Sequence, residues 1–275
     1  IIEICEDINL ICPDAVVFNF SNPMQRICHA VTTKFPDLRF IGLCHEIKSM
    51  NRQLPDLMET EMHNIEYRAA GLNHLSILLE ARYKNTGKDG YPIIKQNFDA
   101  YFSDLVNKHD AKPSKPGAER GVFRKLFKTY GYLPITTDSH LGEYIQWAYS
   151  VADHDAILDF YDNYKEKCLA FYDNKTSYDH YFDLNNLDTH ERVVPIIEGI
   201  LSDSAYEEPA INIPNNGYIE FLPKDIVVEV PGIINKSGIS GISFKNYPAA
   251  FGSLLNSQSG VIQMTTDAVL NASKH

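Results

Sequence analysis

Three things are scarce in this sequence: long apolar runs, positive charge and cysteine. No apolar stretch approaches the roughly 18–20 residues that a membrane-spanning helix needs, and no signal peptide is visible at the start, so we expect no membrane partner. The formal net charge of −11 argues against a nucleic acid or an anionic membrane surface as a partner. The five cysteines are odd in number and irregularly spaced, which fits a reducing compartment better than a disulfide framework. We therefore predict a cytoplasmic protein.

The chain does have enough apolar material for a sizeable core. It contains 275 residues, of which 44% are hydrophobic and 11% aromatic, enough for one large domain or two small ones. An apolar helical stripe begins at Ile1 with no N-cap before it, and Lys274 and His275 directly follow another helical pattern. We therefore expect a fragment of a longer protein, with a complete domain with frayed ends as the alternative.

A strand–helix–strand unit is predicted near the start of the chain. Ala15–Phe20 and Leu38–Leu43 are short apolar runs, and between them Met24–Phe35 has apolar residues at helical spacing. This pattern is typical of one unit of a parallel sheet, and the ligands of such sheets gather at the carboxyl ends of the strands. Asn22 follows the first strand and Cys44 follows the second, so both are candidate site residues.

The rest of the chain alternates between helical patterns and a few short strands. We predict helices at residues 1–11, 50–62, 98–108, 121–130, 141–152, 155–171, 193–202 and 247–272, the last as one or two helices. We predict strands at residues 66–70, 74–83, 210–214 and 226–230, and an irregular segment at 178–188. Residues 85–90 have the composition of a turn, which predicts a hairpin from 74–83 to a further strand near 91–94.

A metal site is one interpretation of the residues that follow the second strand. Cys44 is followed by His45 and Glu46, polar or ligating side chains where a core would need apolar ones, and His74 comes later. Cysteine and histidine suit divalent transition metals, and two protein ligands leave positions open for water or substrate. The alternative is that Cys44 is a buried core residue, as single cysteines usually are, and that His74 is a surface residue.

A second polar phrase, Thr-Thr-Asp-Ser-His-Leu-Gly-Glu-Tyr, occupies residues 136–144. It can be the start of a helix, with Asp138 or Ser139 as N-cap and Glu143 early in the helix. It can equally present the carboxylate of Asp138 and the imidazole of His140 to a cleft. The residue pattern leaves both interpretations open, just as Asn22 can be a simple turn residue.

Taken in order, these phrases resemble glycoside hydrolase family 4. They are Phe-Ser-Asn-Pro at 20–23, Gly-Leu-Cys-His-Glu-Ile at 42–47, Gly-Leu-Asn-His at 71–74, Thr-Asp-Ser-His at 137–140 with Glu143 and Tyr144, and Ile-Pro-Asn-Asn-Gly-Tyr-Ile at 213–219 with Leu222-Pro223 and Val-Val-Glu-Val-Pro at 227–231. The match extends over essentially the whole chain. It implies an α/β part followed by an α+β part: the end of a Rossmann-like NAD-binding domain at residues 1–48, then a catalytic domain at 49–275 that is similar to the carboxyl-terminal half of lactate and malate dehydrogenases.

The resemblance also implies a reaction outside the two-carboxylate scheme of most glycosidases. In this family the sugar is oxidised at C3 with NAD, a base removes the C2 proton, the glycosidic oxygen leaves by elimination, water adds and the sugar is reduced again. A divalent metal such as Mn²⁺ acts as a Lewis acid on the sugar oxygens. The family's Gly-rich nucleotide loop and general acid are expected upstream of Ile1, since no Gly-x-Gly-x-x-Gly follows a strand in this chain.

Carried over residue by residue, the resemblance assigns a role to each candidate. Cys44 and His74 are the metal ligands. Asn22 binds sugar hydroxyls near the nicotinamide, and His45 contacts the sugar or the surroundings of the metal. Asp138 matches the position of the C2 base in the α-glycoside branch of the family.

The residues from Cys44 onward also sort the family by substrate. Cys-His-Glu at 44–46 looks most like the α-galacturonidase branch, so we predict a small α-galacturonide as substrate, with α-galactosides and α-glucosides as the neighbouring options. Two other hypotheses stay open: a 2-hydroxyacid dehydrogenase on a related fold, and a module that serves only in oligomerisation. The resemblance further implies a homo-oligomer, a dimer or a tetramer, for which Tyr172–Tyr181 and the helices near Phe98–Phe102 are candidate interface regions.

Overall fold

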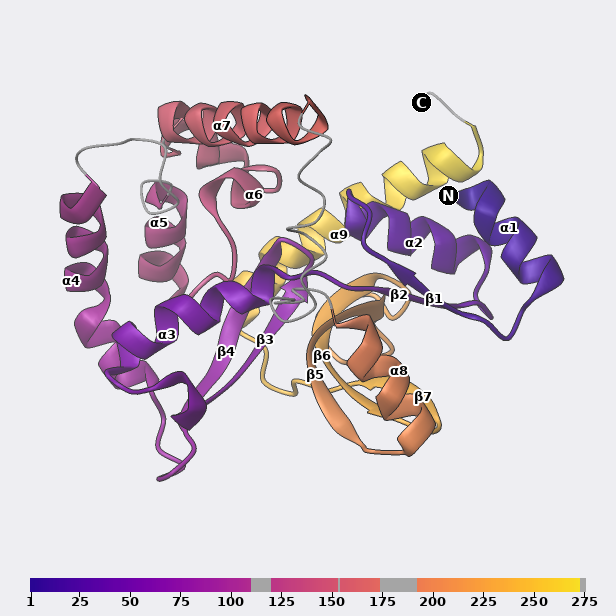
Figure 1. Cartoon of the computed structure of the whole chain (residues 1–275), viewed down its shortest axis with the longest axis horizontal. Coiled ribbons are helices and arrows are strands. Elements are labelled where there is room, and N and C mark those ends of the chain that lie inside the picture. Colours follow the sequence, from indigo (N-terminus) through magenta and orange to yellow (C-terminus); the bar gives the residue numbers. More distant parts are fainter. Residues whose placement is uncertain (110–119, 153, 174–191, 273–275) are drawn as a thin grey trace.

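The described part of the chain folds around one mixed β-sheet. The computed structural model describes residues 1–109, 120–152, 154–173 and 192–272 (Figure 1). Within them the strands are β1 (Val16–Asn19), β2 (Arg39–Gly42), β3 (Ile65–Leu72), β4 (Leu75–Tyr83), β5 (Tyr206–Pro214), β6 (Val227–Asn235) and β7 (Gly238–Gly241). Their order across the sheet is β1-β2-β5-β6-β3-β4, and β7 pairs with β6 off this path.

Helices connect the strands and cover the sheet. The α-helices are α1 (Ile2–Ile11), α2 (Met24–Lys34), α3 (Met50–Met58), α4 (Tyr91–His109), α5 (Gly121–Tyr130), α6 (Asp138–Gly142), α7 (His154–Asp173), α8 (Val193–Ser202) and α9 (Ala249–Leu270). Short 3₁₀ turns lie at Glu46–Ser49, Met62–Asn64 and Gln146–Ser150. Within the described ranges, no helix combines the length and the apolar character needed to cross a bilayer.

The predicted strand–helix–strand unit is present at the start of the chain. β1 and β2 pair in parallel, with Asn19 opposite Gly42, and α2 connects them. Met24, Cys28 and Val31 of α2 are buried in a small core against these strands. Every other strand pairing in the described sheet is antiparallel, so an α/β part is followed by an α+β part, as predicted.

The chain reverses at residues 85–90 as predicted, with one antiparallel bridge between Arg82 and Asp89, but the second strand predicted near 91–94 is wrong. β3 and β4 form the hairpin, and the residues that join them are Asn73 and His74. The segment after residues 85–90, predicted as a strand, begins helix α4. The turn-like composition does redirect the chain, but into a helix, because the Asp89 carboxylate accepts the Tyr91 backbone N–H at 3.1 Å.

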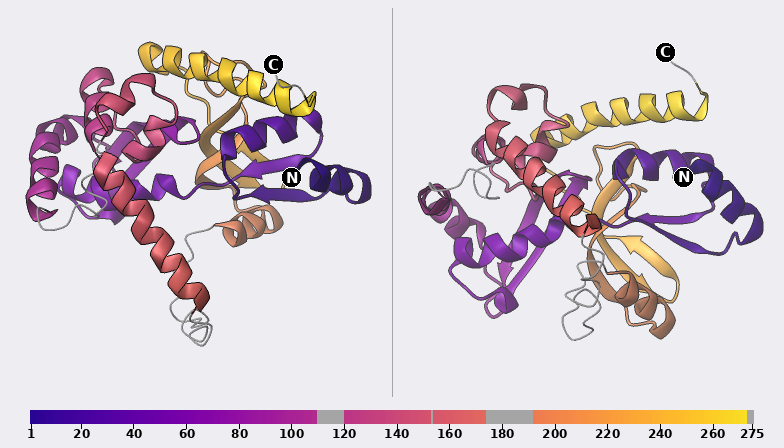
Figure 2. Two further views of the ribbon diagram at one scale, coloured as in Figure 1. Left: turned by 90° about the horizontal axis from the view of Figure 1, so that it is seen from above. Right: turned by 45° about the horizontal axis from the view of Figure 1, so that its top comes forward.

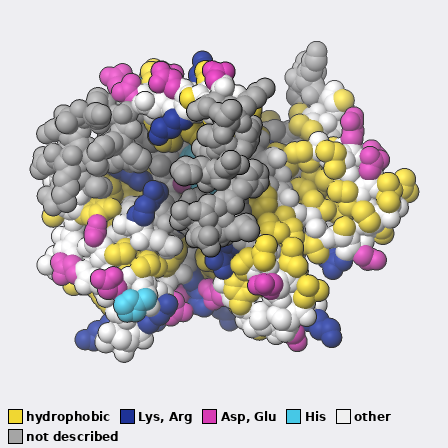
Figure 3. Space-filling model, in the orientation of Figure 1, with side chains coloured by type: hydrophobic (Ala, Val, Ile, Leu, Met, Phe, Trp, Pro, Cys, Tyr) yellow, Lys and Arg dark blue, Asp and Glu magenta, His cyan; other side chains and the backbone are white. Residues whose placement is uncertain are grey.

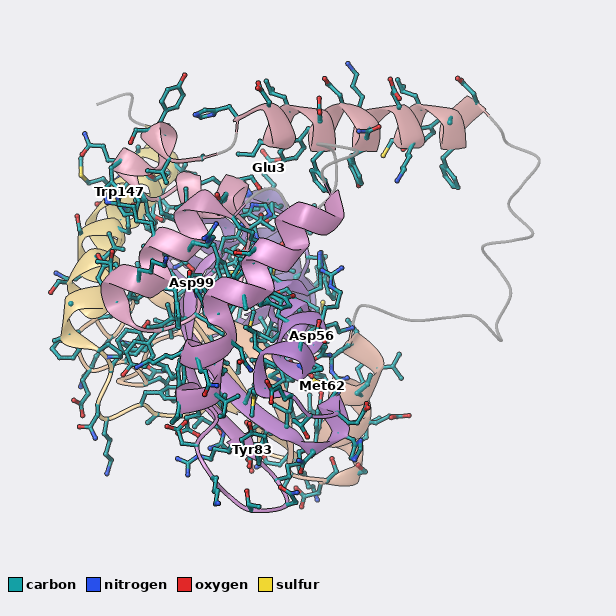
Figure 4. All side chains as sticks on the ribbon, turned by 90° about the vertical axis from the view of Figure 1, so that its left-hand side faces the viewer. Glu3, Asp56, Met62, Tyr83, Asp99 and Trp147 are labelled. Carbon is teal, nitrogen blue, oxygen red and sulfur yellow. The ribbon has the colours of Figure 1, made fainter. Side chains whose placement is uncertain are left out.

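Two other predicted helices end earlier than expected. The helix predicted at 50–62 stops at Met58, because Glu59 adopts a left-handed conformation with a φ of 51°. The helix predicted at 141–152 is split into the end of α6 and a separate 3₁₀ turn. Trp147 in that turn lies beside α5, where the Lys125 ammonium is 5.3 Å from the centre of its ring (Figure 4).

Phenylalanines pack α4 against α5 beside the β3–β4 hairpin. The ring centroids of Phe98 and Phe127 are 4.0 Å apart, and those of Phe102 and Phe123 are 5.5 Å apart. Phe98 and Phe102 are only 2% and 1% exposed. The core of the protein therefore takes these two side chains, whereas the interface expected from the helices near Phe98–Phe102 stays a prediction.

Helix α7 lies outside α5 and α6, and its carboxyl-terminal end extends away from the sheet (Figure 2). Tyr172, the start of the other predicted interface segment, is 67% exposed near that end. Residues 174–181 of this segment lie outside the described residues, and so does the predicted irregular segment at 178–188. The oligomeric state therefore stays a prediction.

Exposed apolar side chains also gather over α1 and α8 (Figure 3). Leu10 and Ile11 on α1 are 82% and 77% exposed, and Val194 and Leu201 on α8 are 63% and 80% exposed. These helix faces are uncovered in this chain, in contrast to α2, which packs between the sheet and α9.

Candidate functional site

The structure brings Cys44 and His74 together at the edge where β2 ends. Cys44 follows the last residue of β2 by two positions, and His74 stands at the tip of the β3–β4 hairpin with a φ of 63°. The Cys44 Sγ and the His74 Nε2 are 3.6 Å apart. Two ligands of one cation, each roughly 2.0–2.3 Å from it, lie roughly 3–4 Å apart, so one cation can bridge these two atoms.

Burial dominates the protonation of both side chains. Burial, followed by the negative charge of Glu229, raises the pKa of the Cys44 thiol to about 12. Burial, followed by the positive charge of His140, lowers the pKa of His74 to about 4. At neutral pH the metal-free site therefore holds a neutral thiol and a neutral imidazole, and a cation that binds Cys44 must displace its proton.

His140 and Glu143 join this pair from α6 and the residue that follows it. The imidazole rings of His74 and His140 stack with 4.0 Å between their centroids, and the His140 Nδ1 is 3.0 Å from the Glu143 Oε1. The possible ligand atoms of His74, His140 and Glu143 all lie within 4.8 Å of one another. In the described part of the chain, no other group of three such side chains is close enough to share an ion.

Carboxylates flank the His140 ring on two sides. Its Nε2 is 3.8 Å from the Glu46 Oε1, and Glu46 in turn accepts the hydroxyl of Thr136 at 3.0 Å. Burial alone would raise the pKa of Glu143, but the hydrogen bond and charge of His140 outweigh it and lower that pKa. On the side of the site formed by α6, the His140 imidazole therefore lies between the carboxylates of Glu46 and Glu143.

Asp138, the predicted base, is fully buried at the start of α6. Its two carboxylate oxygens accept the backbone N–H groups of Val122 and Phe123 at 2.8 and 2.9 Å, at the beginning of α5. Burial raises the pKa of Asp138, and these N–H donors oppose that rise. Asp138 thus anchors the amino terminus of α5 to α6, and its role as a base stays a prediction.

Asn22 and His45, the predicted sugar contacts, are both exposed at the carboxyl ends of the parallel strands. The Asn22 Oδ1 accepts the Met24 backbone N–H at 3.2 Å, which caps the start of α2. His45 directly follows Cys44, and its charge lowers the pKa of His74. Both residues lie at the sheet edge that the sequence predicted.

Cavities adjoin the group on two sides. One of about 570 Å³ is lined by residues of α6, α7 and α9, among them Glu143, Tyr161 and Gln258. A second, of about 80 Å³, is lined by residues that include Cys44 and His45. The larger cavity therefore reaches the site at Glu143, and the smaller one reaches it at Cys44.

Comparison with known proteins decides the family. Residues 1–60 match the family model "Family 4 glycosyl hydrolase", and residues 69–275 match "Family 4 glycosyl hydrolase C-terminal domain". The chain belongs to glycosyl hydrolase family 4. The resemblance stated from the sequence motifs is confirmed, whereas the boundary predicted between residues 48 and 49 stays a prediction.

Relatives within family 4 carry several names. The α-glucosidase of Erwinia rhapontici is 42% identical over 299 residues, which cover 100% of this chain and 64% of the relative. The α-galacturonidase of Thermoanaerobacterium saccharolyticum is 27% identical, over 92% of this chain and 58% of the relative. The chain thus spans less than two thirds of the length of these family 4 proteins.

Solved structures confirm the predicted fold. A 6-phospho-α-glucosidase from gut microorganisms, solved in complex with NAD and Mn²⁺, is similar with a TM-score of 0.75 at 20% identity, over 99% of this chain and 63% of that one. Malate dehydrogenase from Plasmodium falciparum gives a TM-score of 0.53 at 14% identity, over 98% of this chain and 69% of that one. The family 4 chain therefore has a Rossmann-like part and a lactate/malate dehydrogenase-like part.

The structure adds a buried residue that the sequence interpretation did not single out. Glu229 lies in the middle of β6 and is 2% exposed. Burial raises the pKa of its carboxyl, against the hydrogen bonds of Asn73, Ser76 and Asn212. A signal was available, because Val-Val-Glu-Val at 227–230 places one acid inside an otherwise apolar strand, where an unpartnered charge would be costly.

Proposed function

We propose that this chain is the catalytic part of an α-glycoside hydrolase that works by NAD- and metal-dependent redox elimination. The observation on which the proposal rests is the approach of Cys44 and His74 to 3.6 Å between Sγ and Nε2, where Cys44 also lines the smaller cavity. Membership of family 4 and the 42% identity to an α-glucosidase support the reaction class.

The donor atoms present fit a divalent cation. Cys44 and His74 would hold it, and His140 and Glu143 offer a further imidazole nitrogen and a carboxylate oxygen within 4.8 Å of His74. An imidazole whose pKa is about 4 is available as a ligand at neutral pH without losing a proton. A mixed set of sulfur, nitrogen and oxygen donors suits Mn²⁺ or another transition metal better than Ca²⁺ or Mg²⁺, which prefer oxygen alone.

This chain offers fewer candidate contacts for NAD than for the cation. The parallel strands β1 and β2 end beside Asn22 and Cys44, the edge at which dinucleotides bind in such sheets. A Gly-rich phosphate loop is not among the residues of this sequence, so Asn22 is the one nucleotide contact that we propose here. When bound, NAD would supply the oxidation and later reduction of the sugar carbon, and the cation would supply Lewis-acid stabilisation of its oxygens.

The chain's own residues would then hold the sugar and move the C2 proton. We propose that Asn22 and His45 orient the sugar hydroxyls. Asp138 is the predicted base, but to act as one it must release the N–H groups of Val122 and Phe123. His140 is the alternative base, supported by its stacking on His74 and by the carboxylate partners that would stabilise its protonated form.

An α-glucoside is the proposed substrate. The α-galacturonide predicted from Cys-His-Glu at 44–46 is a weaker candidate, since the α-galacturonidase relative is 27% identical and the α-glucosidase relative 42%. The carboxylates of Glu46 and Glu143 at the site also favour a neutral sugar over an anionic one. The decisive comparison is the rate on matched p-nitrophenyl α-glucoside and α-galacturonide, and faster cleavage of the galacturonide would reverse this choice.

The reaction class is tested by isotope exchange in the full-length protein. In deuterated water with NAD and Mn²⁺, the released sugar should carry deuterium at C2, and a chelator should stop turnover. Asp138→Asn should lose exchange and hydrolysis together if Asp138 is the base, and His140→Gln should do so if His140 is. Hydrolysis without C2 exchange and without NAD would sink the elimination mechanism.

An oxidoreductase is the competing function, supported by the likeness of fold to a malate dehydrogenase. A 2-hydroxyacid dehydrogenase does not need Cys44 with His74, so its turnover should be insensitive to a chelator. We also propose a dimer or tetramer, with Tyr172 and the helices near Phe98–Phe102 as candidate interface regions. A monomer by light scattering at micromolar concentration would refute the oligomer.

A further inference from the structure

One row of paired residues crosses the sheet from edge to edge. From β1 to β4 the residues in register are Asn19, Gly42, Asn212, Glu229, Gly71 and Ser76, and we call them the polar row. Residues paired across neighbouring strands point to the same face of a sheet. That face is the one under α2, since the Asn19 amide lies 3.9 Å from the Cys28 sulfur. All six residues are glycine or polar, although the surrounding core is apolar.

The glycines of the polar row leave space for its longer side chains. A Cβ on Gly71 would lie 2.4 Å from the Leu75 carbonyl oxygen and 3.0 Å from the Ser76 Oγ. A Cβ on Gly42 would lie 2.9 Å from the Cβ of Asn212. Ser76 can therefore reach over Gly71 to β6, and Asn212 can lie against β2.

Glu229 is the group on which these side chains converge. Its Oε2 accepts the Asn73 amide at 2.8 Å and the Asn212 amide at 3.3 Å, and its Oε1 accepts the Ser76 hydroxyl at 2.9 Å. Three donors directed at one buried carboxylate satisfy it from both oxygens, as a buried charge requires.

Both loops that bear the candidate ligands are connected to this carboxylate. Asn73 directly precedes His74, so its hydrogen bond connects the tip of the β3–β4 hairpin to Glu229. Asn212 additionally donates to the carbonyl of Gly42, two residues before Cys44, at 3.4 Å. One carboxylate thus fixes the orientation of two amides, one in contact with each loop.

We propose that Glu229 is a positioning residue, which keeps Cys44 and His74 at metal-binding distance by fixing the amides of Asn73 and Asn212. Asn73, Glu229 and Asn212 join the tip of the β3–β4 hairpin to the end of β2 by hydrogen bonds. The two segments that bear His74 and Cys44 are therefore held together. Groups behind metal ligands act in this way in many proteins, and their loss typically weakens metal affinity by about 10- to 100-fold. The inference rests on the proposed metal centre. The distance that it explains, 3.6 Å from the Cys44 Sγ to the His74 Nε2, is observed independently of that proposal.

The test uses the full-length protein and the Mn²⁺ dissociation constant, measured by titration. In Glu229→Leu the dissociation constant should rise by about 10- to 100-fold. Glu229→Gln should restore most of this loss, because its oxygen can accept both amides and its nitrogen can donate to the Ser76 hydroxyl. Asn73→Ala should match Glu229→Leu, and the double variant should lose little more than either single variant, since both changes break the same connection.

Ser76→Ala is the matched control. It removes a hydrogen bond of Glu229 that leads to neither ligand, so its Mn²⁺ affinity should stay within about threefold of the wild type. A loss in Ser76→Ala as large as in Asn73→Ala, or no rescue by Glu229→Gln, would overturn the positioning role.

Crystal structures of the metal-free proteins test the same inference independently of the reaction. The distance from the Cys44 Sγ to the His74 Nε2 is 3.6 Å here and should lengthen in Glu229→Leu. An unchanged distance would refute the positioning role even if the protein hydrolyses α-glycosides as proposed. Conversely, a wild type that binds no Mn²⁺ would refute the proposed function, while a lengthened distance in the variant would still support the positioning of these side chains.

Discussion

The candidate site has a strand-borne half and a helix-borne half, and they are supported in different ways. Cys44 and His74 follow β-strands and rest on the buried hydrogen bonds of Asn73 and Glu229. His140 and Glu143 lie on or just after α6, which has five residues, and their side chains are 24% and 44% exposed. The strand-borne half is therefore fixed by the sheet, whereas the helix-borne half is held by ion pairs near solvent.

This difference indicates a division of tasks. A cation needs ligands that do not move, and residues built on sheets can supply them. Binding a sugar and moving a proton need side chains that water and substrate can reach, as at His140 and Glu143. The predictions below separate the two halves, beginning with the largest expected effect.

Cys44→Ser and His74→Ala should abolish Mn²⁺ binding and turnover in the full-length enzyme. Serine is a near-isostere of cysteine, but its hydroxyl is a much poorer ligand than a thiolate. The fold should survive, because Cys44 is only half-buried. Titration with Mn²⁺ and a circular dichroism spectrum check both statements, and full activity in Cys44→Ser would remove the strand-borne half from the mechanism.

His140→Gln and Glu143→Gln should weaken Mn²⁺ binding less, by about 10-fold. Their exposure lets water replace them, and Cys44 and His74 remain. Turnover should fall more than affinity, since Glu143 lines the cavity that we expect to hold the sugar and His140 pairs with Glu143. A loss of affinity equal to that in His74→Ala would mean that both halves bind the cation equally.

Asp138→Ala should lower the free energy of unfolding by about 1–2 kcal/mol, the usual effect of losing a helix cap. The change leaves the N–H groups of Val122 and Phe123 without their acceptor. Asp138→Asn keeps one acceptor and should lose less. Urea denaturation measures both variants, and an unchanged midpoint in Asp138→Ala would show that the cap contributes little.

The smallest effect concerns pH and Glu229. Burial raises the pKa of this carboxyl above its ordinary value of 4.5, so the folded state holds the proton more strongly than the unfolded state. Its contribution to stability is fully present below pH 4.5 and is lost as pH rises through the folded pKa. Glu229→Gln lacks this titration, so its stability should fall less with rising pH, by at most about 1.4 kcal/mol per pH unit. Denaturation of the metal-free proteins at a series of pH values measures the difference, and parallel pH profiles would contradict it.

The elements that the sequence predicted well are those with a strong local pattern. The helices at 121–130 and 193–202 have the predicted bounds, and the first strand–helix–strand unit is in place. β7 was missed because Gly238–Gly241 has neither alternation nor branched residues beyond one isoleucine. The β3–β4 turn was missed because Asn73 and His74 carry no glycine, the usual sign of a tight hairpin.

The site was predictable only as far as local motifs reach. The residue types make a metal site at Cys44 and His74 one interpretation, only the resemblance assigns both as ligands, and the phrase at 136–144 is compatible with a helix start or with a cleft. The structure shows features of both: Asp138 anchors a helix, and His140 stacks on His74. Spacing along the chain cannot give that contact, because it depends on how α6 packs against the hairpin.

The polar row exists only if the strands pair in the correct register. The metal affinity of the candidate centre therefore reports on strand register. A shift of β6 by one residue would turn Glu229 to the opposite face of the sheet and bring Val228 or Val230 opposite Asn212. Asn73 would then lose its acceptor, although most backbone hydrogen bonds of the sheet could re-form. Backbone-based signals such as circular dichroism would hardly register that error. The affinity for the cation would register that error. A refolded sample that regains its spectrum but not its affinity would contain mispaired sheets.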